Sequence, residues 1–247
     1  MLGNRQRRNG TVCGHGLISQ ARNNPILPVF DLIIFDCDGV LLESEIISCS
    51  TDAVELTKAG FPYTTEEVCE QFLGKSLKSM LATIEADHGK PLPNGFSDHL
   101  KRCNKERFEQ KLVAVDGIEQ VLDGLALPFC VASSSDVARL NHSLGLVGLH
   151  GRFAPHIYSA DHVENAKPAP DLFLHAASCM GAVPDRCLVI EDSLAGVAAG
   201  LAAGMAVLGF HGGAHCPAGH GDRLTKAGTH RIFDRMVDLP ALIGELG

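Results

Sequence analysis

Two carboxylates stand one residue apart directly after an apolar run. Residues 32–35 are apolar, Asp36 follows them, and Asp38 and Gly39 come immediately afterwards. Carboxylates held this close repel each other, so one must be protonated or both must be held by a cation. A ligand set made of oxygen and free of sulfur suits a hard ion such as Mg²⁺. The spacing therefore predicts a Mg²⁺ site at the end of this run.

A second acidic pair, Glu191 and Asp192, ends another apolar run. If the two runs are neighbouring parallel strands, three or four acids converge on one point, which a bound metal would stabilise. A carboxylate can also attack phosphorus and form an aspartyl-phosphate, while a metal screens the repulsion between the two anions. A carboxyl two residues further on can protonate the leaving oxygen and then deprotonate the attacking water.

Two further positions suit the binding of phosphoryl oxygens. Ser133 ends the apolar run 128–133 and offers a hydroxyl, with backbone N–H groups such as that of Ser134 nearby. Lys167 precedes a predicted helix and offers a fixed positive charge. Each feature alone is common, because serine often ends a strand as part of a turn. The interpretation depends on the whole set, which occurs in order at the carboxyl ends of predicted strands.

The elements that carry these residues alternate along the chain. The predicted strands cover residues 32–35, 128–133, 156–160, 187–191 and 205–210. Strands that are apolar on both faces and alternate with helices predict an open parallel sheet covered by helices. We therefore expect an α/β fold with a Rossmann-like, doubly wound sheet, whose ligands bind beyond the carboxyl ends of the strands.

Apolar spacing and capping residues predict the helices between the strands. Residues 135–146 form one helix, Pro170 lies in the first turn of the next, and Ser193 can cap a third. The apolar face of this third helix is predicted to consist of Leu194, Val197, Ala198 and Leu201. Gly196 and Gly200 would leave a smooth stripe on it for close packing.

Residues 45–114 show helical signals throughout and no strand signal. An all-helical insert that leaves and re-enters the sheet next to the acids is well placed to act as a lid. The predicted organisation is a flexible leader at 1–26, an α/β core at 27–44 and 115–247, and a helical cap at 45–114. Lys75 on this cap is a candidate for contact with the substrate, although an exposed surface charge is a slightly better interpretation.

Composition excludes several classes of partner. No apolar run is long enough to span a membrane, and the start of the chain lacks the apolar segment of a secretory signal. A transit peptide is an alternative to the flexible leader. The chain after residue 26 keeps 21 − 4 = 17 basic and 29 acidic residues, a formal charge of −12. Such a body repels nucleic acid and anionic membranes, so neither is an expected partner.

Cysteine and histidine usage gives no clear metal motif. The nine cysteines are scattered singly without a C-x-x-C pair, which argues against a disulfide framework and against a zinc knuckle. They are typical of buried residues in a reducing compartment, so we expect a cytoplasmic protein. His211, His215 and His220 lie in a Gly-rich stretch without an acid or cysteine partner of definite geometry. We expect that stretch to be a flexible loop.

The four motifs together resemble those of the haloacid dehalogenase-like superfamily of phosphohydrolases. The family's D-x-D-G matches residues 36–39, its Ser or Thr matches Ser133, its K-P-x-P matches 167–170, and its E-D-S-x-x-G matches 191–196. The resemblance covers about residues 30–247. The helical insert resembles the small cap of the subgroup that holds phosphoglycolate phosphatase, beta-phosphoglucomutase and 6-phosphogluconate phosphatase.

The resemblance implies roles for the acids. Asp36 would be the nucleophile and a metal ligand. Asp38 would be the general acid and base and would bind the metal through its backbone carbonyl. Asp192 would be the third ligand to Mg²⁺, with Glu191 close behind it. Ser133, Ser134 and Lys167 would bind the phosphoryl group, and Lys167 would also steady Asp36.

The implied function is a Mg²⁺-dependent phosphatase for a small phosphorylated metabolite, a sugar or sugar-acid phosphate, acting as a monomer or weak homodimer. True dehalogenases of the superfamily lack the second acid, so Asp38 favours phosphate chemistry. The alternative is a phosphosugar mutase like beta-phosphoglucomutase. Such mutases carry a His and an Arg at positions that fall here at Ser48 and near Leu77, and both departures weaken that alternative. An inactive binding module is disfavoured because no motif residue is lost.

Overall fold

The computed structural model describes residues 30–73 and 76–246, which include a six-stranded sheet. The strands are β1 Leu32–Phe35, β2 Phe129–Ser133, β3 Ile157–Ser159, β4 Cys187–Glu191, β5 Ala206–Phe210 and β6 Arg231–Phe233. All neighbouring pairs are parallel, in the order β3-β2-β1-β4-β5-β6. This is the Rossmann-type order. The five predicted strands are confirmed, and β6 was not predicted because it is short and begins with an exposed arginine.

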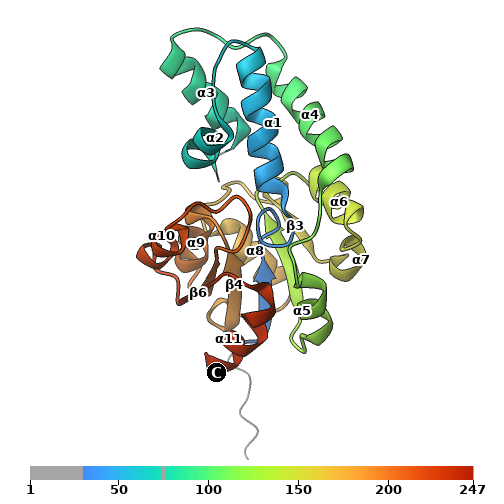
Figure 1. The fold of residues 1–247 in the computed structure, drawn as a ribbon. Helices are drawn as coiled ribbons and strands as arrows, with labels where there is room; N and C mark the ends of the chain where they lie inside the picture. The colour runs from blue at the N-terminus through green and yellow to red at the C-terminus, as the bar shows by residue number, and fades with distance from the viewer. Residues whose placement is uncertain (1–29, 74–75, 247) are drawn as a thin grey trace, which may run out of the picture.

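Helices cover both faces of this sheet (Figure 1). They are α5 Ile118–Gly124, α6 Val137–Leu146, α7 His150–Phe153, α8 Asp171–Cys179, α9 Leu194–Ala202, α10 His220–Ala227 and α11 Leu239–Glu245, with short 3₁₀ turns at Ala160–His162, Pro184–Arg186 and Met236–Asp238. One hydrophobic cluster joins the sheet to α5, α6, α7 and α11, and a second joins it to α8, α9 and α10. Successive residues of β1 alternate between the two clusters, with Ile33 in the first and Ile34 in the second. A strand buried on both faces has this pattern.

Four further helices follow β1 and lie beyond the sheet (Figure 1). They are α1 Ser44–Lys58, α2 Thr65–Phe72, α3 Leu77–His88 and α4 Phe96–Lys111. They share a hydrophobic cluster of their own, built around Leu56, Phe61, Ile84 and Leu100. A separate core is what an inserted domain needs, and the division into core and cap at residues 45–114 stays a prediction. The predicted leader at 1–26 lies outside the described residues.

The predicted cap at Ser193 is confirmed, Pro170 lies at the N-cap position just before α8 and not within its first turn, and one helical face was predicted wrongly. The Ser193 side chain accepts a hydrogen bond from the backbone of Gly196 and caps α9. Val197 is buried as predicted, but Leu194 and Ala198 are exposed, and Ala199 is buried although the predicted face did not include it. A helix made largely of small residues carries little apolar contrast, so its spacing does not fix which side is buried. No helix among the described residues is long and apolar enough to cross a membrane.

Candidate active site

Three buried carboxylates meet where β1 and β4 end. Asp36 follows β1, and its backbone N–H donates to the carbonyl of Ile190 at 2.9 Å. Glu191 is the last residue of β4, and Asp192 follows it. Asp36, Glu191 and Asp192 are 7%, 1% and 3% exposed, and carboxylate oxygens of the three lie within 4.8 Å of one another. The predicted convergence of acids at neighbouring strand ends is therefore confirmed.

Lys167 lies between two of these acids. Its Nζ donates to Asp36 Oδ1 at 2.6 Å, to Glu191 Oε1 at 2.7 Å and to the carbonyl of Ala132 at 2.9 Å. Burial would lower the pKa of Lys167, but the two carboxylates outweigh it and raise the pKa. Burial raises the pKa of Asp36, with Glu191 and Asp192 adding to the rise and Lys167 opposing it. One ammonium thus stands among three carboxylates.

Asp38 lies close by but is held by a different set of groups. It accepts hydrogen bonds from Ser44 Oγ at 2.5 Å, from Ser135 Oγ at 2.6 Å and from Arg139 Nη2 at 3.0 Å. Burial would raise the pKa of Asp38, but the charge of Arg139 and these hydrogen bonds outweigh it and leave the pKa lowered. The Asp38 carboxyl is therefore ionised at neutral pH in the substrate-free protein.

The predicted phosphate-binding serines lie beside the acids. Ser133 is buried, and its Oγ accepts a hydrogen bond from the backbone N–H of Ser135 at 3.1 Å. Ser133, Ser134 and Lys167 all line one cavity of about 580 Å³, together with Asp36 and Asp38. The same cavity is lined by α1 and α4. Lys75, the tentative contact residue of the cap, lies outside the described residues.

The prediction of a flexible His-rich loop is wrong for two of its three histidines. His215 and His220 are buried, 4% and 3% exposed. The Nε2 of His215 lies 2.8 Å from Asp192 Oδ2, and the Nε2 of His220 lies 2.6 Å from the Asp192 carbonyl oxygen. Burial lowers the pKa of His215, but Asp192 and Cys216 outweigh it and raise the pKa to about 11, so the imidazole is cationic. This loop follows β5 and therefore starts at the same edge of the sheet as the acids. That position in the sequence was a signal that the loop could contact them.

Gly39 shows how closely this loop packs onto the acids. Its φ is +83°, and a Cβ at this position would lie 2.0 Å from Asp192 Oδ2 and 2.7 Å from His215 Cε1. Only glycine fits a left-handed backbone so near to both groups. The glycine of the D-x-D-G motif is thus required by the approach of Asp192 and His215.

The buried acids and the two cations beside them have more negative than positive charge. Asp36, Glu191 and Asp192 carry up to three negative charges, against the two positive charges of Lys167 and His215. The ligand atoms that these three acids offer are carboxylate oxygens, which are the donors that a hard divalent cation prefers. The residues present therefore fit such a cation.

Comparisons with known proteins agree with the geometry. The sequence model described as haloacid dehalogenase-like hydrolase matches residues 33–210. The 6-phosphogluconate phosphatase of Escherichia coli (strain K12) is 30% identical over 181 residues, which cover 73% of this chain and 82% of that protein. Hexitol phosphatase A of the same organism is also 30% identical, over 74% of this chain and 84% of that protein.

Two solved structures share the fold. A conserved haloacid dehalogenase-like protein from Agrobacterium tumefaciens has a TM-score of 0.82 and 44% identity, covering 88% of this chain and 99% of its own. A HAD family hydrolase from Deinococcus radiodurans, with bound phosphate and sodium, has a TM-score of 0.75 and 33% identity, covering 88% and 96%. The chain therefore belongs to the haloacid dehalogenase-like hydrolase family, as a hydrolase of phosphoric monoesters.

Proposed function

We propose that the protein is a Mg²⁺-dependent phosphatase that hydrolyses the phosphate ester of a small sugar or sugar acid. The observation that carries the proposal is the group of Asp36, Asp38, Lys167 and Asp192 on the wall of a single cavity of about 580 Å³. A cavity of this size accommodates a small metabolite. The group supplies a nucleophile, a proton carrier, a fixed cation and a metal ligand within it.

The two oxygens of Asp36 have different surroundings. Lys167 donates to Oδ1, which leaves Oδ2 to attack phosphorus and form an aspartyl-phosphate. As the ester bond breaks, Asp38 in its protonated form donates that proton to the leaving oxygen, and the carboxylate so formed afterwards accepts a proton from the water that hydrolyses the intermediate. Because the pKa of Asp38 is lowered, its carboxyl group is ionised in the absence of substrate, and this ionised form is the one that accepts the proton from water. Ser133, Ser134 and Lys167 would hold the phosphoryl oxygens during both.

A Mg²⁺ ion held by Asp36, Asp192 and the backbone carbonyl of Asp38 would screen the repulsion between the nucleophile and the phosphate. Glu191 would stay outside that ligand set, because it already accepts hydrogen bonds from Lys167 and from the Ser193 backbone and hydroxyl. His215 would orient Asp192 through their contact at 2.8 Å, as the outer partners of metal ligands commonly do.

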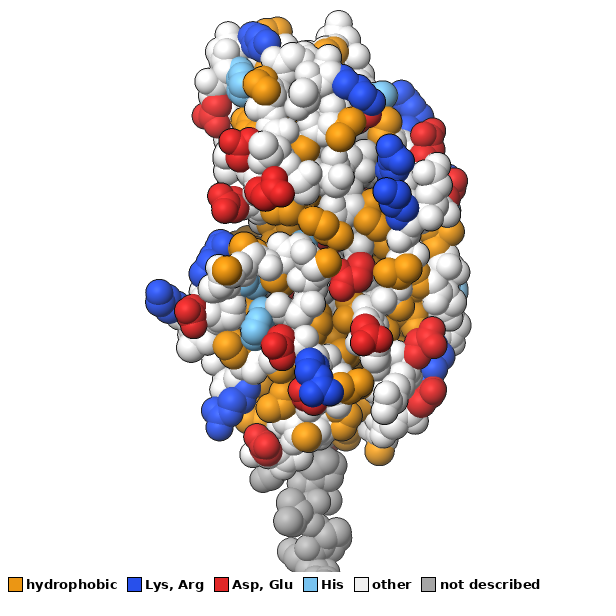
Figure 2. Space-filling view, in the orientation of Figure 1, with side chains coloured by type: hydrophobic (Ala, Val, Ile, Leu, Met, Phe, Trp, Pro, Cys, Tyr) orange, Lys and Arg blue, Asp and Glu red, His pale blue; other side chains and the backbone are white. Residues whose placement is uncertain are grey.

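The cavity wall supports a substrate that carries several hydroxyl groups. Several polar residues line the cavity, among them Ser48, Asn104, Arg139 and Ser143. Hydroxyl, amide and guanidinium groups can exchange hydrogen bonds with the hydroxyl groups of a sugar. Lys101 and Lys105 of α4 line the same cavity, and Lys and Arg side chains gather over α4 (Figure 2). These charges suit a second anionic group, such as the carboxylate of a sugar acid.

The mutase alternative finds little support in the same cavity. Ser48 and Leu77 line it, so the two positions do face the site. A serine and a leucine there offer neither the imidazole nor the guanidinium that the mutase resemblance implies. A mutase would require a bisphosphate activator and would release little free phosphate, and a phosphatase releases one phosphate for each substrate consumed.

The test is phosphate release from a panel of sugar phosphates and sugar-acid phosphates, with and without Mg²⁺, for the wild type and Asp36→Asn. We expect the variant to fold normally and to lose at least about a thousandfold in kcat. Asp31→Asn is the matched control, because Asp31 lies just before β1 and pairs on the surface with Arg186. Normal turnover by Asp36→Asn, or full activity without a divalent ion, would contradict the proposal.

A further inference from the structure

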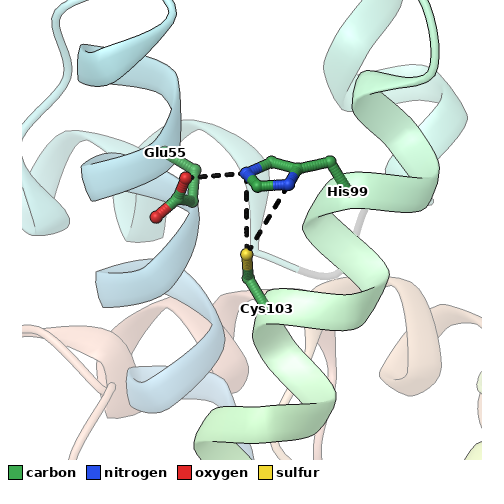
Figure 3. Close-up of side chains that lie close together, drawn as sticks. All are labelled: Glu55, His99 and Cys103. Atoms are coloured by element: carbon green, nitrogen blue, oxygen red, sulfur yellow. Dashed lines mark hydrogen bonds and ion pairs between the residues drawn. The ribbon is translucent and has the colours of Figure 1, made fainter.

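Two helices of the cap bring a carboxylate, an imidazole and a thiol together outside the lining of the catalytic cavity. Glu55 lies on α1, and His99 and Cys103 lie four residues apart on α4 (Figure 3). One ligand atom from each of these three residues lies within 4.8 Å of the other two. None of the three lines the catalytic cavity. From this grouping we propose that the cap carries a Zn²⁺ site made of Glu55, His99 and Cys103.

The chemistry of the three ligands selects the metal. Thiolate and imidazole together favour a borderline-soft ion such as Zn²⁺ over Mg²⁺ or Ca²⁺, which prefer oxygen. Three protein ligands leave a fourth tetrahedral position open for water. The catalytic acids offer the opposite set, made of oxygen alone, so one chain would hold two sites with different metal preferences.

The distances are close to those of a tetrahedral site. The Sγ of Cys103 lies 3.6 Å from His99 Nε2, and tetrahedral Zn–S and Zn–N bonds would place these atoms about 3.5 Å apart. The Nε2 of His99 lies 2.8 Å from Glu55 Oε2, where a bound Zn²⁺ would require about 3.4 Å. An opening of a few tenths of an ångström therefore accommodates the ion. The His99 side chain is 42% exposed and has room to move.

The imidazole ring has to turn as well. The Sγ of Cys103 is nearly equidistant from the two ring nitrogens of His99, at 3.6 Å and 3.9 Å. The sulfur thus does not yet face a single nitrogen, and a rotation of the ring about its Cβ–Cγ bond would aim Nε2 between sulfur and carboxylate. Lys58 holds the other oxygen of Glu55 at 2.7 Å, so the carboxylate is already oriented toward His99.

Zn²⁺ binding would displace a proton from the thiol. Burial and the nearby carboxylates raise the pKa of Cys103, so the thiol is protonated at neutral pH when no metal is bound. The thiolate is the form that binds a metal. Affinity should therefore fall as the pH is lowered, and the bound ion should join α1 to α4.

A second His–Cys pair in the chain is a matched control. His175 and Cys179 lie four residues apart on α8, with Sγ at 3.7 Å and 4.0 Å from the ring nitrogens. No acid joins this pair to form a three-ligand group among the described residues. The two pairs have the same spacing of His and Cys, and only the pair on α4 has a carboxylate, that of Glu55, beside it.

The test is titration of the reduced full-length protein with Co²⁺ as a spectroscopic probe, in excess Mg²⁺ to occupy the catalytic acids. We expect a sulfur-to-cobalt charge-transfer band in the near ultraviolet in the wild type and in Cys179→Ser. Cys103→Ser should lose the band, and His99→Ala and Glu55→Gln should weaken Co²⁺ binding by about tenfold or more. Circular dichroism would verify that each variant is folded.

Zn²⁺ gives an independent readout. At about a hundredfold excess over its dissociation constant, Zn²⁺ should raise the unfolding midpoint of the wild type by about 5 °C or more, and should not raise that of Cys103→Ser. A charge-transfer band that persists in Cys103→Ser or disappears in Cys179→Ser would overturn the proposal, and so would a wild type that shows no band.

Discussion

The carboxyl group of Asp38 has an unusual set of partners for a group that must exchange protons. Arg139 reaches it from α6 at 3.0 Å, and two serine hydroxyls complete its shell. The guanidinium of Arg139 also lies 5.0 Å from the ring centre of Phe108 on α4. Arg139 therefore contacts both the proposed acid and base of the site and a helix of the cap. Its charge stabilises the ionised form of Asp38.

Replacing Arg139 should change the pH dependence of catalysis. In the free enzyme Asp38 must be protonated to act as a general acid, so its pKa sets the basic limb of the profile of kcat/KM. Arg139→Gln removes the neighbouring positive charge, raises the pKa of Asp38 and should move that limb to higher pH by about 1 to 3 units. Steady-state rates measured across the pH range test this.

Arg139→Lys is the control for that experiment, because it retains a positive charge near Asp38. Its basic limb should stay much closer to that of the wild type than the limb of Arg139→Gln. If both variants lost activity without any displacement of the limb, Arg139 would serve the structure or the substrate and would not set the proton affinity of Asp38.

Among the helices, the start of α9 explains why the fourth motif ends in a glycine, Gly196. The side chain of Glu191 turns back over the first turn of this helix and accepts hydrogen bonds from Ser193 N and Oγ at 2.8 Å and 3.0 Å. A Cβ at Gly196 would lie 1.6 Å from Glu191 Oε1. The absence of a side chain at Gly196 is what allows Glu191 to reach Lys167. The prediction that Gly196 serves helix packing was thus incomplete.

Gly196→Ala should therefore be strongly destabilising. The new methyl group would displace Glu191 and leave Lys167 with a weakened ion pair in a buried place, at a cost of about 3 kcal/mol in the free energy of unfolding. Gly145→Ala in α6 is the matched control, since a Cβ there meets nothing within 4 Å. It should stabilise the protein by about 0.5–1 kcal/mol. Urea unfolding of both variants measures the difference, and equal midpoints would contradict this account.

The strands and helices of the site also determine which of its residues could be predicted from the sequence alone. Asp36, Ser133 and Asp192 could be found because each ends or follows a strongly apolar run, and parallel strands end at one edge of a sheet. Lys167 could be found because it lies in a K-P-x-P sequence just before a predicted helix. The contact of Arg139 with Asp38 could not be found, since it depends on how α6 folds back over that edge. For His215 the position of its loop after β5 was a signal, but its contact with Asp192 was not predictable from it. Local spacing contains no information on such long-range contacts. For the same reason the pairing of Glu55 with His99, from two different helices, has no signature in the sequence.

At the scale of the whole molecule, the cavity between the sheet and the cap helices concentrates buried acids. Burial raises the pKa of Glu45 to about 7, with Asp38 adding to the rise, and raises that of Asp52 to about 6 against a hydrogen bond from Asn104. Burial also raises the pKa of Asp192 to about 7, against the opposing effect of His215. In the unfolded chain these acids would titrate near 4. The folded protein therefore binds protons that the unfolded chain has already released.

This difference gives the protein without metal a defined dependence of stability on pH. An acid whose pKa is higher in the folded state stabilises that state at low pH, and the contribution is lost as the pH rises from about 4 to about 7. These groups should thus make the free energy of unfolding fall across that range. A divalent cation competes with protons for Asp36 and Asp192, so it should restore the lost stability near neutral pH and have little effect in acid.

We accordingly expect Mg²⁺, at a concentration well above its dissociation constant, to raise the unfolding midpoint by about 5 °C near pH 7.5 and by much less near pH 5. Asp52→Asn should flatten the pH dependence of the metal-free protein and keep the effect of Mg²⁺, because Asp52 lies on the cavity wall and outside the acid cluster. Asp192→Asn should abolish the effect of Mg²⁺, because it removes a ligand. Thermal unfolding of the wild type and the two variants at pH 5 and pH 7.5 separates the contribution of proton binding from that of Mg²⁺ binding. An equal rise of the midpoint with Mg²⁺ at the two pH values would show that the ion does not bind at these buried acids.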